Sequence, residues 1–327
     1  MLSNKRILIT GGTGSFGRKC ARFILENYDP QKLIIFSRDE LKQYEMAQEF
    51  PSGDYPISYF IGDVTDSDRV YRALDGVDYV IHAAAMKQVP ASERNPFEAI
   101  KTNILGAQNI INASIDRDVK KVIALSTDKA VNPVNLYGAT KLCSEKLFVA
   151  GNSYSGSHKA RFSVVRYGNV MGSRGSVIPL FFDRRSTGIL PITDLRMTRF
   201  WITLDQGIRL VMSALADMQG GEVFVPKIPS MSIVDLAKAI APECEFDIIG
   251  LRPGEKVHEV LISETEAYYT KEYNDYYVIA PQYKWSTDDK SIAEEGKVVP
   301  DGFQYTSDSN ECWFTIEEMK NAVVGFE

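Results

Sequence analysis

A short apolar run that leads into a glycine-rich turn constrains the fold of this chain more than any other feature. The run Arg6–Thr10 is followed by Gly11-Gly12-Thr13-Gly14-Ser15-Phe16-Gly17 and then by a helical pattern, Phe16–Asn27. Strand, glycine turn and helix in this order form the first unit of dinucleotide-binding α/β domains. A structural turn without a ligand is the alternative, but five more strand-like runs follow this one. We therefore predict a dinucleotide site at this turn.

The spacing of the glycines indicates how the turn would hold the ligand. Gly11 permits the tight turn, Gly14 lets the backbone approach a pyrophosphate, and Gly17 lets the helix pack closely on the strand. The phosphates would lie at the helix N-terminus, where free N–H groups and the helix dipole favour anions. The residues of the predicted turn site are Gly11, Thr13, Gly14, Ser15, Phe16 and Gly17.

The rest of the first half alternates short β-branched runs with helical patterns, which is typical of a parallel sheet. The expected strands are Arg6–Thr10, Leu33–Ser37, Ile57–Ile61, Tyr79–His82, Val122–Ser126 and Phe162–Tyr167. The expected helices are Phe16–Asn27, Glu40–Glu49, Pro96–Ser114 and Leu136–Phe148. Further along, Asp205–Asp217 and Ser232–Ile240 read as helices, and Glu222–Val225 and Phe246–Leu251 as strands.

These patterns predict an α/β fold, a Rossmann-type doubly wound parallel sheet with a smaller, interleaved C-terminal substrate-binding lobe. Residues 1–168 would form the dinucleotide domain, and 202–226 would return to it. Residues 169–201, rich in Gly, Ser, Pro and Arg, would form the substrate-binding lobe together with 227–327. The tail from Lys271 is polar and aromatic and shows few long apolar patterns.

Composition limits the partners of the chain. The net charge of −6 over 327 residues argues against a general nucleic-acid binder, so an anionic substrate would need a local basic pocket. The four cysteines lie far apart without paired spacing, as expected of reduced, buried thiols in a cytoplasmic protein. No signal peptide and no apolar run of about 18 residues is present, so we expect no membrane segment. The three histidines show no metal-ligand spacing, and we expect no metal.

The ends of the second, third and fourth strands indicate which dinucleotide binds. Ser37-Arg38 offers a hydroxyl and a guanidinium suited to a 2′-phosphate, which favours NADP over NAD. Asp39 and Glu40 could instead cap the next helix, and Arg38 could simply be solvated. Further cofactor candidates are Asp63, which could equally cap a helix, its neighbour Val64, the small residues Ala83 and Ala84, and Lys87, whose alternative is a solvated surface position.

Two proton-handling pairs follow the fifth strand. Tyr137 and Lys141 are four residues apart on one helical face, and a lysine ammonium beside a phenol favours phenolate. Asp128 and Lys129, directly after Thr127, form a second acid/base pair that plain alcohol oxidation does not need. Two such pairs near one nicotinamide suggest a reaction with an elimination inside it. An ordinary solvated pair at a strand end is the alternative for Asp128-Lys129.

These motifs resemble the extended short-chain dehydrogenase/reductase superfamily, on the glycine turn, Asp63, Asn103, Ser126-Thr127 and the Tyr137/Lys141 pair. Longer runs resemble its inverting UDP-N-acetylglucosamine 4,6-dehydratases, which open pseudaminic acid biosynthesis. These runs are Phe36–Lys42, Ser126–Ala130, Asn135–Lys141, Arg166–Val170 and Arg252–Lys256. The related retaining enzymes carry methionine in place of the tyrosine, and many have an N-terminal membrane region. Tyr137 and the absence of such a region match the inverting branch.

The resemblance implies a mechanism on a UDP-sugar, with Asn103, Tyr137 and Lys141 among the cofactor-binding residues. Tyr137, held by Lys141, would take the proton of the sugar 4-hydroxyl while Thr127 orients the 4-oxygen and hydride leaves C4 for NADP⁺. Lys129 would then remove the C5 proton, and Asp128 would help hydroxide leave C6. A lysine is a base only when neutral, and the Asp128 carboxylate opposes that, so stabilisation of the enolate by an ammonium is the alternative role of Lys129.

Candidate substrate-binding residues are Lys87, Thr127, Asn169, Arg174, Arg199, Arg252 and Glu255, with arginine suited to phosphate and glutamate to a ribose hydroxyl. For each arginine a surface salt bridge is the alternative. A nucleotide-sugar 4-epimerase, which needs the same fold and Tyr-Lys pair, and a catalytically idle NADP-binding regulator are the rival functions. A homo-oligomer is expected, because the outer helices of such domains commonly pack against a partner.

Overall fold

The apolar runs of the first half form the parallel strands of one large sheet. The computed structural model describes residues 1–156, 158–173, 175–282 and 296–325. The sheet order is β16-β14-β15-β10-β6-β5-β4-β1-β2-β3, and the seven strands from β10 to β3 pair in parallel. Their bounds are β1 Arg6–Thr10, β2 Lys32–Ser37, β3 Ile57–Ile61, β4 Tyr79–His82, β5 Lys121–Thr127, β6 Arg161–Tyr167 and β10 Val223–Pro226. The predicted strands of the first half are confirmed, and 222–225 returns to the sheet as β10.

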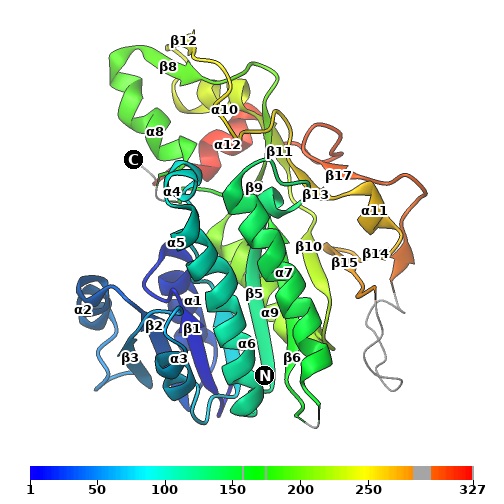
Figure 1. Cartoon of the computed structure of the whole chain (residues 1–327). Helices are drawn as coiled ribbons and strands as arrows, with labels where there is room; N and C mark the ends of the chain where they lie inside the picture. The colour runs from blue at the N-terminus through cyan, green and yellow to red at the C-terminus, as the bar shows by residue number, and fades with distance from the viewer. Residues whose placement is uncertain (157, 174, 283–295, 326–327) are drawn as a thin grey trace.

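Helices cover both faces of this sheet, as expected of a doubly wound fold. On one face α6 packs against α3 and α7, and α6 and α7 cross in front of the strands in Figure 1. On the other face α1 packs against α9. The helices of these layers are α1 Ser15–Asn27, α2 Glu40–Glu49, α3 Ser67–Ala73, α4 Val89–Arg94, α5 Pro96–Ile100, α6 Gly106–Asp116, α7 Leu136–Tyr154 and α9 Leu204–Asp217.

A smaller lobe lies over the upper end of the sheet in Figure 1 and has its own apolar core. Its core side chains include Phe181, Trp201 and Leu236, all without solvent exposure. Its helices are α8 Val177–Arg184, η3 Arg185–Thr187, α10 Ile233–Ile240 and α12 Ile316–Ala322, whereas α11 Glu264–Ala267 packs against the large sheet. Its strands are β7 Asn169–Val170, β8 Ile189–Ile192, β9 Thr198–Ile202, β11 Ser230–Ser232, β12 Glu245–Ile248, β13 Val260–Ile262 and β17 Tyr305–Thr306.

The polar tail contributes strands that its sequence does not predict. β14 Thr270–Glu272, β15 Tyr276–Ile279 and β16 Lys297–Val298 extend the large sheet in antiparallel fashion beside β10. They are only two to four residues long, too short to show a periodic pattern.

The expectation of buried thiols is wrong for Cys143 and Cys312, which are exposed, and right for Cys20.

The topology places a cleft at one edge of the sheet. β1 lies between β2 and β4, so the chain crosses over the sheet in opposite directions after β3. In open α/β sheets, ligands bind beyond the carboxyl ends of the strands at such a switch point. The glycine turn after β1, the alanines after β4 and the Thr127-Asp128-Lys129 segment after β5 all lie at this edge.

Candidate active site

A cleft of about 1050 Å³ runs between the carboxyl edge of the sheet and the smaller lobe. Most residues predicted from the sequence to form a site line this one space. They are Gly11, Thr13, Gly14, Ser15, Phe16, Gly17, Ser37, Arg38, Asp63, Val64, Ala83, Ala84, Lys87, Thr127, Lys129, Tyr137, Lys141, Asn169, Arg199, Arg252 and Glu255. The fold thus brings together residues from both halves of the chain.

The glycine turn has the geometry of an anion-binding turn. Gly11 adopts φ of +63°, and a Cβ atom there would lie 2.9 Å from the backbone nitrogen of Ala84. Any other residue at position 11 would displace the backbone of the segment that follows β4, so only glycine fits this turn. Gly14 is the N-cap of α1 and supplies no side-chain cap, so the first-turn N–H groups are available for phosphate oxygens. The residues present therefore fit a dinucleotide.

The end of β2 has one buried and one exposed polar group. The Ser37 hydroxyl is buried and accepts hydrogen bonds from Thr13 (3.2 Å) and Gln43 (3.1 Å). The Arg38 side chain is 73% exposed, and its Nη1 lies 3.4 Å from Asp63 Oδ2. A mobile guanidinium at the cleft edge can turn toward a phosphate group without large cost, because exposed ion pairs are weak.

Two neighbouring carboxylates have local structural roles. Asp39 caps α2 by accepting from the Lys42 backbone, the alternative considered from the sequence. Asp63 Oδ1 accepts from the Thr65 N–H and hydroxyl at 3.0 Å each, while Asp66 caps α3. Asp63 is therefore not the helix cap.

Asn103 is a correction to the predicted cofactor set. It lies in a π-helical turn, η1 Lys101–Leu105, and is 2% exposed. Its amide accepts from Met86 N (2.8 Å) and donates to Met86 O (3.0 Å) and Thr140 Oγ1 (2.9 Å). These hydrogen bonds join the segment after β4 to α7. Asn103 is not among the described residues that line the cleft. It supports the site instead of contacting a ligand.

The start of α7 carries the Tyr-Lys pair into the cleft. Asn135 caps this helix through the Gly138 N–H (2.7 Å), and Gly138 itself faces the Lys129 carbonyl so closely that a Cβ would collide with it. Glycine at 138 therefore lets α7 press against the Asp128–Ala130 turn, η2. Tyr137 and Lys141 are 9% and 4% exposed.

Burial shifts the pKa values of this pair away from the charged forms. It raises the pKa of Tyr137 to about 12, although the Lys129 charge opposes the shift. It lowers the pKa of Lys141 to about 8, although Glu145 opposes the shift. Lys141 Nζ donates to the carbonyl of Leu125 in β5 at 2.7 Å, and this hydrogen bond fixes the position of the ammonium group. Lys141 can therefore lose or gain a proton close to neutral pH.

Asp128 and Lys129 form a close ion pair at the end of β5. Asp128 Oδ1 accepts from Lys129 Nζ (3.0 Å) and from the Thr127 hydroxyl (2.9 Å). Lys129 Nζ also lies 3.5 Å from Asn169 Oδ1. Asp128 is fully buried and, unlike Thr127 and Lys129, is not part of the described cleft lining. Its Oδ2 has no hydrogen-bond partner among the described residues.

Burial and neighbouring charges both act on this pair. Burial raises the pKa of Asp128, against the opposing charge of Lys129. Burial alone would lower the pKa of Lys129, but the carboxylates of Asp128 and Glu259 outweigh it and leave that pKa raised. Lys129 is therefore an ammonium in the resting protein.

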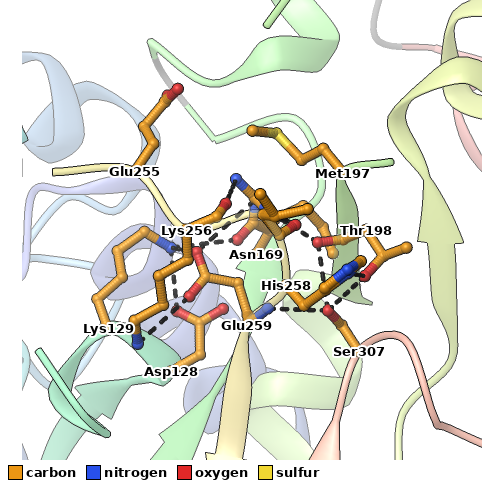
Figure 2. Close-up of polar contacts among 12 residues, drawn as sticks. Asp128, Lys129, Asn169, Met197, Thr198, Glu255, Lys256, His258, Glu259 and Ser307 are labelled. Atoms are coloured by element: carbon orange, nitrogen blue, oxygen red, sulfur yellow. Dashed lines mark hydrogen bonds and ion pairs between the residues drawn. The ribbon is translucent and has the colours of Figure 1, made fainter. Parts of the chain in front are cut away.

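Glu259 and Lys256 are site residues that sequence reasoning missed. Glu259 Oε1 lies 3.4 Å from Lys129 Nζ, and Glu259 Oε2 lies 3.8 Å from Lys256 Nζ; dashed lines in Figure 2 join both pairs. Both residues line the cleft. The only signal in the sequence was the Arg252–Lys256 run, which ends at Lys256 and three residues before Glu259.

The predicted phosphate-binding arginines have three different outcomes. Arg199 lines the cleft and is 7% exposed, and its guanidinium donates to the carbonyls of Thr198, Lys256 and Val257. Three of its five N–H donors are used in these bonds, and its role toward phosphate stays a prediction. Arg252 is paired with Glu255 at 2.7 Å, with 62% of its side chain exposed. Arg174 lies outside the described residues.

Neither a metal site nor a membrane span is found in the described part of the chain. None of its His, Cys, Asp and Glu side chains form a group of three or more that could hold a metal ion. None of the described helices is both long and apolar enough to cross a bilayer.

Known proteins match the chain over most of its length. A family model described as polysaccharide biosynthesis protein matches residues 7–281. An inverting UDP-N-acetylglucosamine 4,6-dehydratase of Campylobacter jejuni is 56% identical, and the match covers 98% of this chain and 97% of that protein. A UDP-glucose 4-epimerase of Rickettsia canadensis is 41% identical, with 99% and 96% covered.

A solved structure agrees with these matches. The X-ray structure of Pen from Bacillus thuringiensis superposes with a TM-score of 0.90 at 38% identity, covering 100% of this chain and 98% of that one. The resemblance to inverting dehydratases that the motifs predicted is thus confirmed, as is the Rossmann-type fold. The chain belongs to the polysaccharide biosynthesis protein family.

Proposed function

We propose that this protein is an NADP-dependent UDP-N-acetylglucosamine 4,6-dehydratase that inverts C5. Its product would be UDP-2-acetamido-2,6-dideoxy-β-L-arabino-hex-4-ulose. The observation that carries the proposal is the ion pair of the half-buried Lys129 with the buried Asp128, which adjoins Tyr137 and Lys141 at one cleft. A dehydration needs a second acid/base pair besides the one that handles the alcohol proton. The 56% identical relative named for this reaction supports the same assignment.

The turn after β1 would hold the cofactor pyrophosphate on the N–H groups of α1, and Arg38 would bind the 2′-phosphate of NADP. When bound, the nicotinamide supplies the acceptor for the C4 hydride and returns that hydride to C6. Comparing NADP and NAD affinity in the wild type and in Arg38→Ala tests the cofactor choice. We expect Arg38→Ala to weaken NADP about tenfold and to leave NAD unchanged. An unchanged preference for NADP would refute this assignment.

Tyr137 and Lys141 would act in the oxidation. Tyr137 takes the proton of the sugar 4-hydroxyl as C4 becomes a ketone, and Thr127, on the cleft wall, orients the 4-oxygen. The burial that raises the pKa of Tyr137 disfavours a resting phenolate, so the nearby positive charge of Lys129 assists this proton transfer. Lys141, anchored on the Leu125 carbonyl, would position the nicotinamide ribose.

Asp128 and Lys129 would act in the elimination that the C4 ketone makes possible. Transfer of one proton from the Lys129 ammonium to the Asp128 carboxylate gives a neutral amine and a carboxylic acid together. The amine then takes the C5 proton, and the acid proton goes to the C6 hydroxyl, which leaves as water. Since Asp128 is buried, we route its proton through the Thr127 hydroxyl, which bonds it at 2.9 Å. A proton from the solvent would then reach C5 on the opposite face as C6 accepts the hydride, and this inverts C5.

The alternative role of Lys129 keeps its proton in place. As an ammonium it would stabilise the enolate without taking the C5 proton, in agreement with its raised pKa. Exchange of the C5 hydrogen with deuterated water separates the roles, because Lys129→Ala abolishes the exchange only if the lysine is the base.

Incubation with UDP-N-acetylglucosamine and NADP, followed by mass measurement of the product, tests the function. Loss of one water supports the dehydratase. An unchanged mass with altered stereochemistry at C4 supports a 4-epimerase, the second candidate, which the 41% identical Rickettsia relative favours. No change of the sugar would leave an NADP-binding regulator.

We further propose that the enzyme is a cytoplasmic homo-oligomer that acts at the start of pseudaminic acid biosynthesis. The exposed apolar side chains of Phe97 (59%) and Leu105 (48%), on the outer helices α5 and η1, support an oligomer. Light scattering of the purified protein tests it, and a monomeric mass would contradict it.

A further inference from the structure

A carboxylate from the smaller lobe reaches the Asp128–Lys129 pair. Glu259 lies directly before β13, is 2% exposed and points its Oε1 at Lys129 Nζ (3.4 Å) and Arg199 Nε (3.7 Å). Its Oε2 lies 3.8 Å from Lys256 Nζ and has no hydrogen-bond partner among the described residues. In Figure 2 the Glu259 side chain lies beside Asp128, and a dashed line joins it to Lys129.

The C-terminal segment fixes the backbone of Glu259. Its N–H donates to the Ser307 hydroxyl (2.9 Å), and the Ser307 N–H donates to its carbonyl (2.9 Å). Ser307 also bonds Thr198, whose hydroxyl lies 2.8 Å from His258 Nδ1. Glu259 is thereby held from both sides, and β13 lies against η2, which carries Asp128 and Lys129.

Burying this carboxylate has a cost that the fold does not need to bear. A buried ion pair is often no more stabilising than apolar residues of the same volume, and one oxygen of Glu259 lacks a hydrogen bond. A second carboxylate beside Lys129 is also more than one ammonium requires, since Asp128 already pairs with it at 3.0 Å. A role in the chemistry of the pair explains why the carboxylate is there.

We propose that Glu259 is a positioning residue for the elimination: its carboxylate holds Lys129 against Asp128 and keeps the pair supplied with its proton. The inference rests on the proposed dehydratase function. The elimination requires Asp128 and Lys129 to share one proton. This proton is on Lys129 at rest and on Asp128 when the C6 hydroxyl leaves. A fixed negative charge beside both groups retains that proton as the pH rises.

The charges around the pair agree with this role. The Glu259 carboxylate raises the pKa values of both Lys129 and Asp128. Burial would raise the pKa of Glu259 itself, but Lys129, Arg199 and Lys256 outweigh burial and keep it lowered, so Glu259 stays an anion. The charged or titratable groups that face the pair are the Glu259 carboxylate, the cations Arg199 and Lys256, and the phenol of Tyr137.

The test compares Glu259→Gln, Glu259→Asp and the control Glu243→Gln, which makes the same chemical change at an exposed turn of the same lobe. The readout is the pH dependence of water loss, measured by product mass and compared with that of C4 oxidation in the same single turnover, because Lys141, with its pKa lowered to about 8, titrates in the oxidation step. In Glu259→Gln we expect the alkaline limb to move about one pH unit lower and kcat at its optimum to fall about tenfold. Glu259→Asp keeps the charge, so its limb stays in place, and Glu243→Gln behaves as the wild type.

Lys256→Met provides an independent variant with the opposite sign. Lys256 is a cation that partly neutralises Glu259, so its removal should move the alkaline limb of water loss to higher pH. This variant tests the role of Glu259 even if Glu259→Gln fails to fold. Reduced nicotinamide formed in a single turnover reports C4 oxidation, and we expect Glu259→Gln to retain it. A fall in kcat with unmoved limbs in Glu259→Gln and Lys256→Met would overturn the inference. A wild type that releases no water would instead refute the proposed function.

Discussion

The cleft contains two lysines whose pKa values are displaced in opposite directions. Lys141 donates to a backbone carbonyl, and burial lowers its pKa to about 8, although Glu145 opposes the shift. Lys129 is half-buried, with 27% of its side chain exposed, and two carboxylates outweigh its desolvation and raise its pKa. Of the two lysines at this cleft, Lys141 is therefore ready to release its proton, whereas Lys129 holds its proton firmly.

This difference indicates how one cleft can run two kinds of proton transfer. Titratable groups with pKa values pushed apart by their surroundings commonly have different acid/base roles. The Tyr137–Lys141 pair comes from one helix turn, whereas the cluster of Asp128, Lys129 and Glu259 is assembled from both lobes. We expect the two groups to act in successive half-reactions, and the variants below test that separation.

The largest effect is expected for Tyr137→Phe. Without the phenol, no group takes the 4-hydroxyl proton, so both oxidation and the elimination that depends on it should fall about 10⁴-fold. Stopped-flow absorbance of reduced nicotinamide and product mass measure the two. Activity within tenfold of wild type would show that Tyr137 is not the acceptor.

Lys129→Ala should separate the two half-reactions. Oxidation at C4 should slow only modestly, because it loses just the assisting positive charge of Lys129, while water loss and C5 exchange in deuterated water should fall about 10³-fold, since the shared proton has lost its carrier. Equal losses in oxidation and water loss would mean that the two groups of residues act as a unit. Undiminished C5 exchange would exclude Lys129 as the base.

A smaller loss is expected for Asp128→Asn, which retains shape and buried volume but cannot hold the acid proton. Water loss should fall about 10²-fold, and C5 exchange should be affected less than in Lys129→Ala. Cofactor binding, measured by fluorescence titration, should be unchanged because Asp128 lies behind the cleft lining. Full water-loss activity would show that another group protonates the leaving hydroxyl.

The smallest effect concerns stability. Because the pKa of Lys141 is lowered in the folded protein, the unfolded chain binds more protons between pH 8 and the ordinary lysine pKa near 10.5. Its contribution to the free energy of unfolding therefore rises with pH across that window. Between pH 8 and 10, denaturant titrations should show the wild type gaining on the order of 2 kcal/mol relative to Lys141→Met. A pH-independent difference would contradict the lowered pKa.

Local patterns in the sequence were sufficient for much of this molecule. The glycine spacing, the short apolar runs of the strands, and the Tyr137 and Lys141 pair one helical turn apart are patterns among near neighbours in the chain. The positive φ of Gly11 and the period of a helix are set within a few residues, so a single sequence displays them. The adjacency of Asp128 and Lys129 was likewise visible before the fold was known.

Only the tertiary structure decided what those residues meet. It brought Glu259 and Lys256 to Lys129, bonded Arg199 to three backbone carbonyls, and occupied the Asn103 amide between two segments. It also added the short tail strands β14 to β16 to the central sheet. Sequence position cannot reveal such contacts, because they arise when lobes distant in the chain pack together. Burial and opposing charge then set each pKa, and both are properties of the assembled cleft.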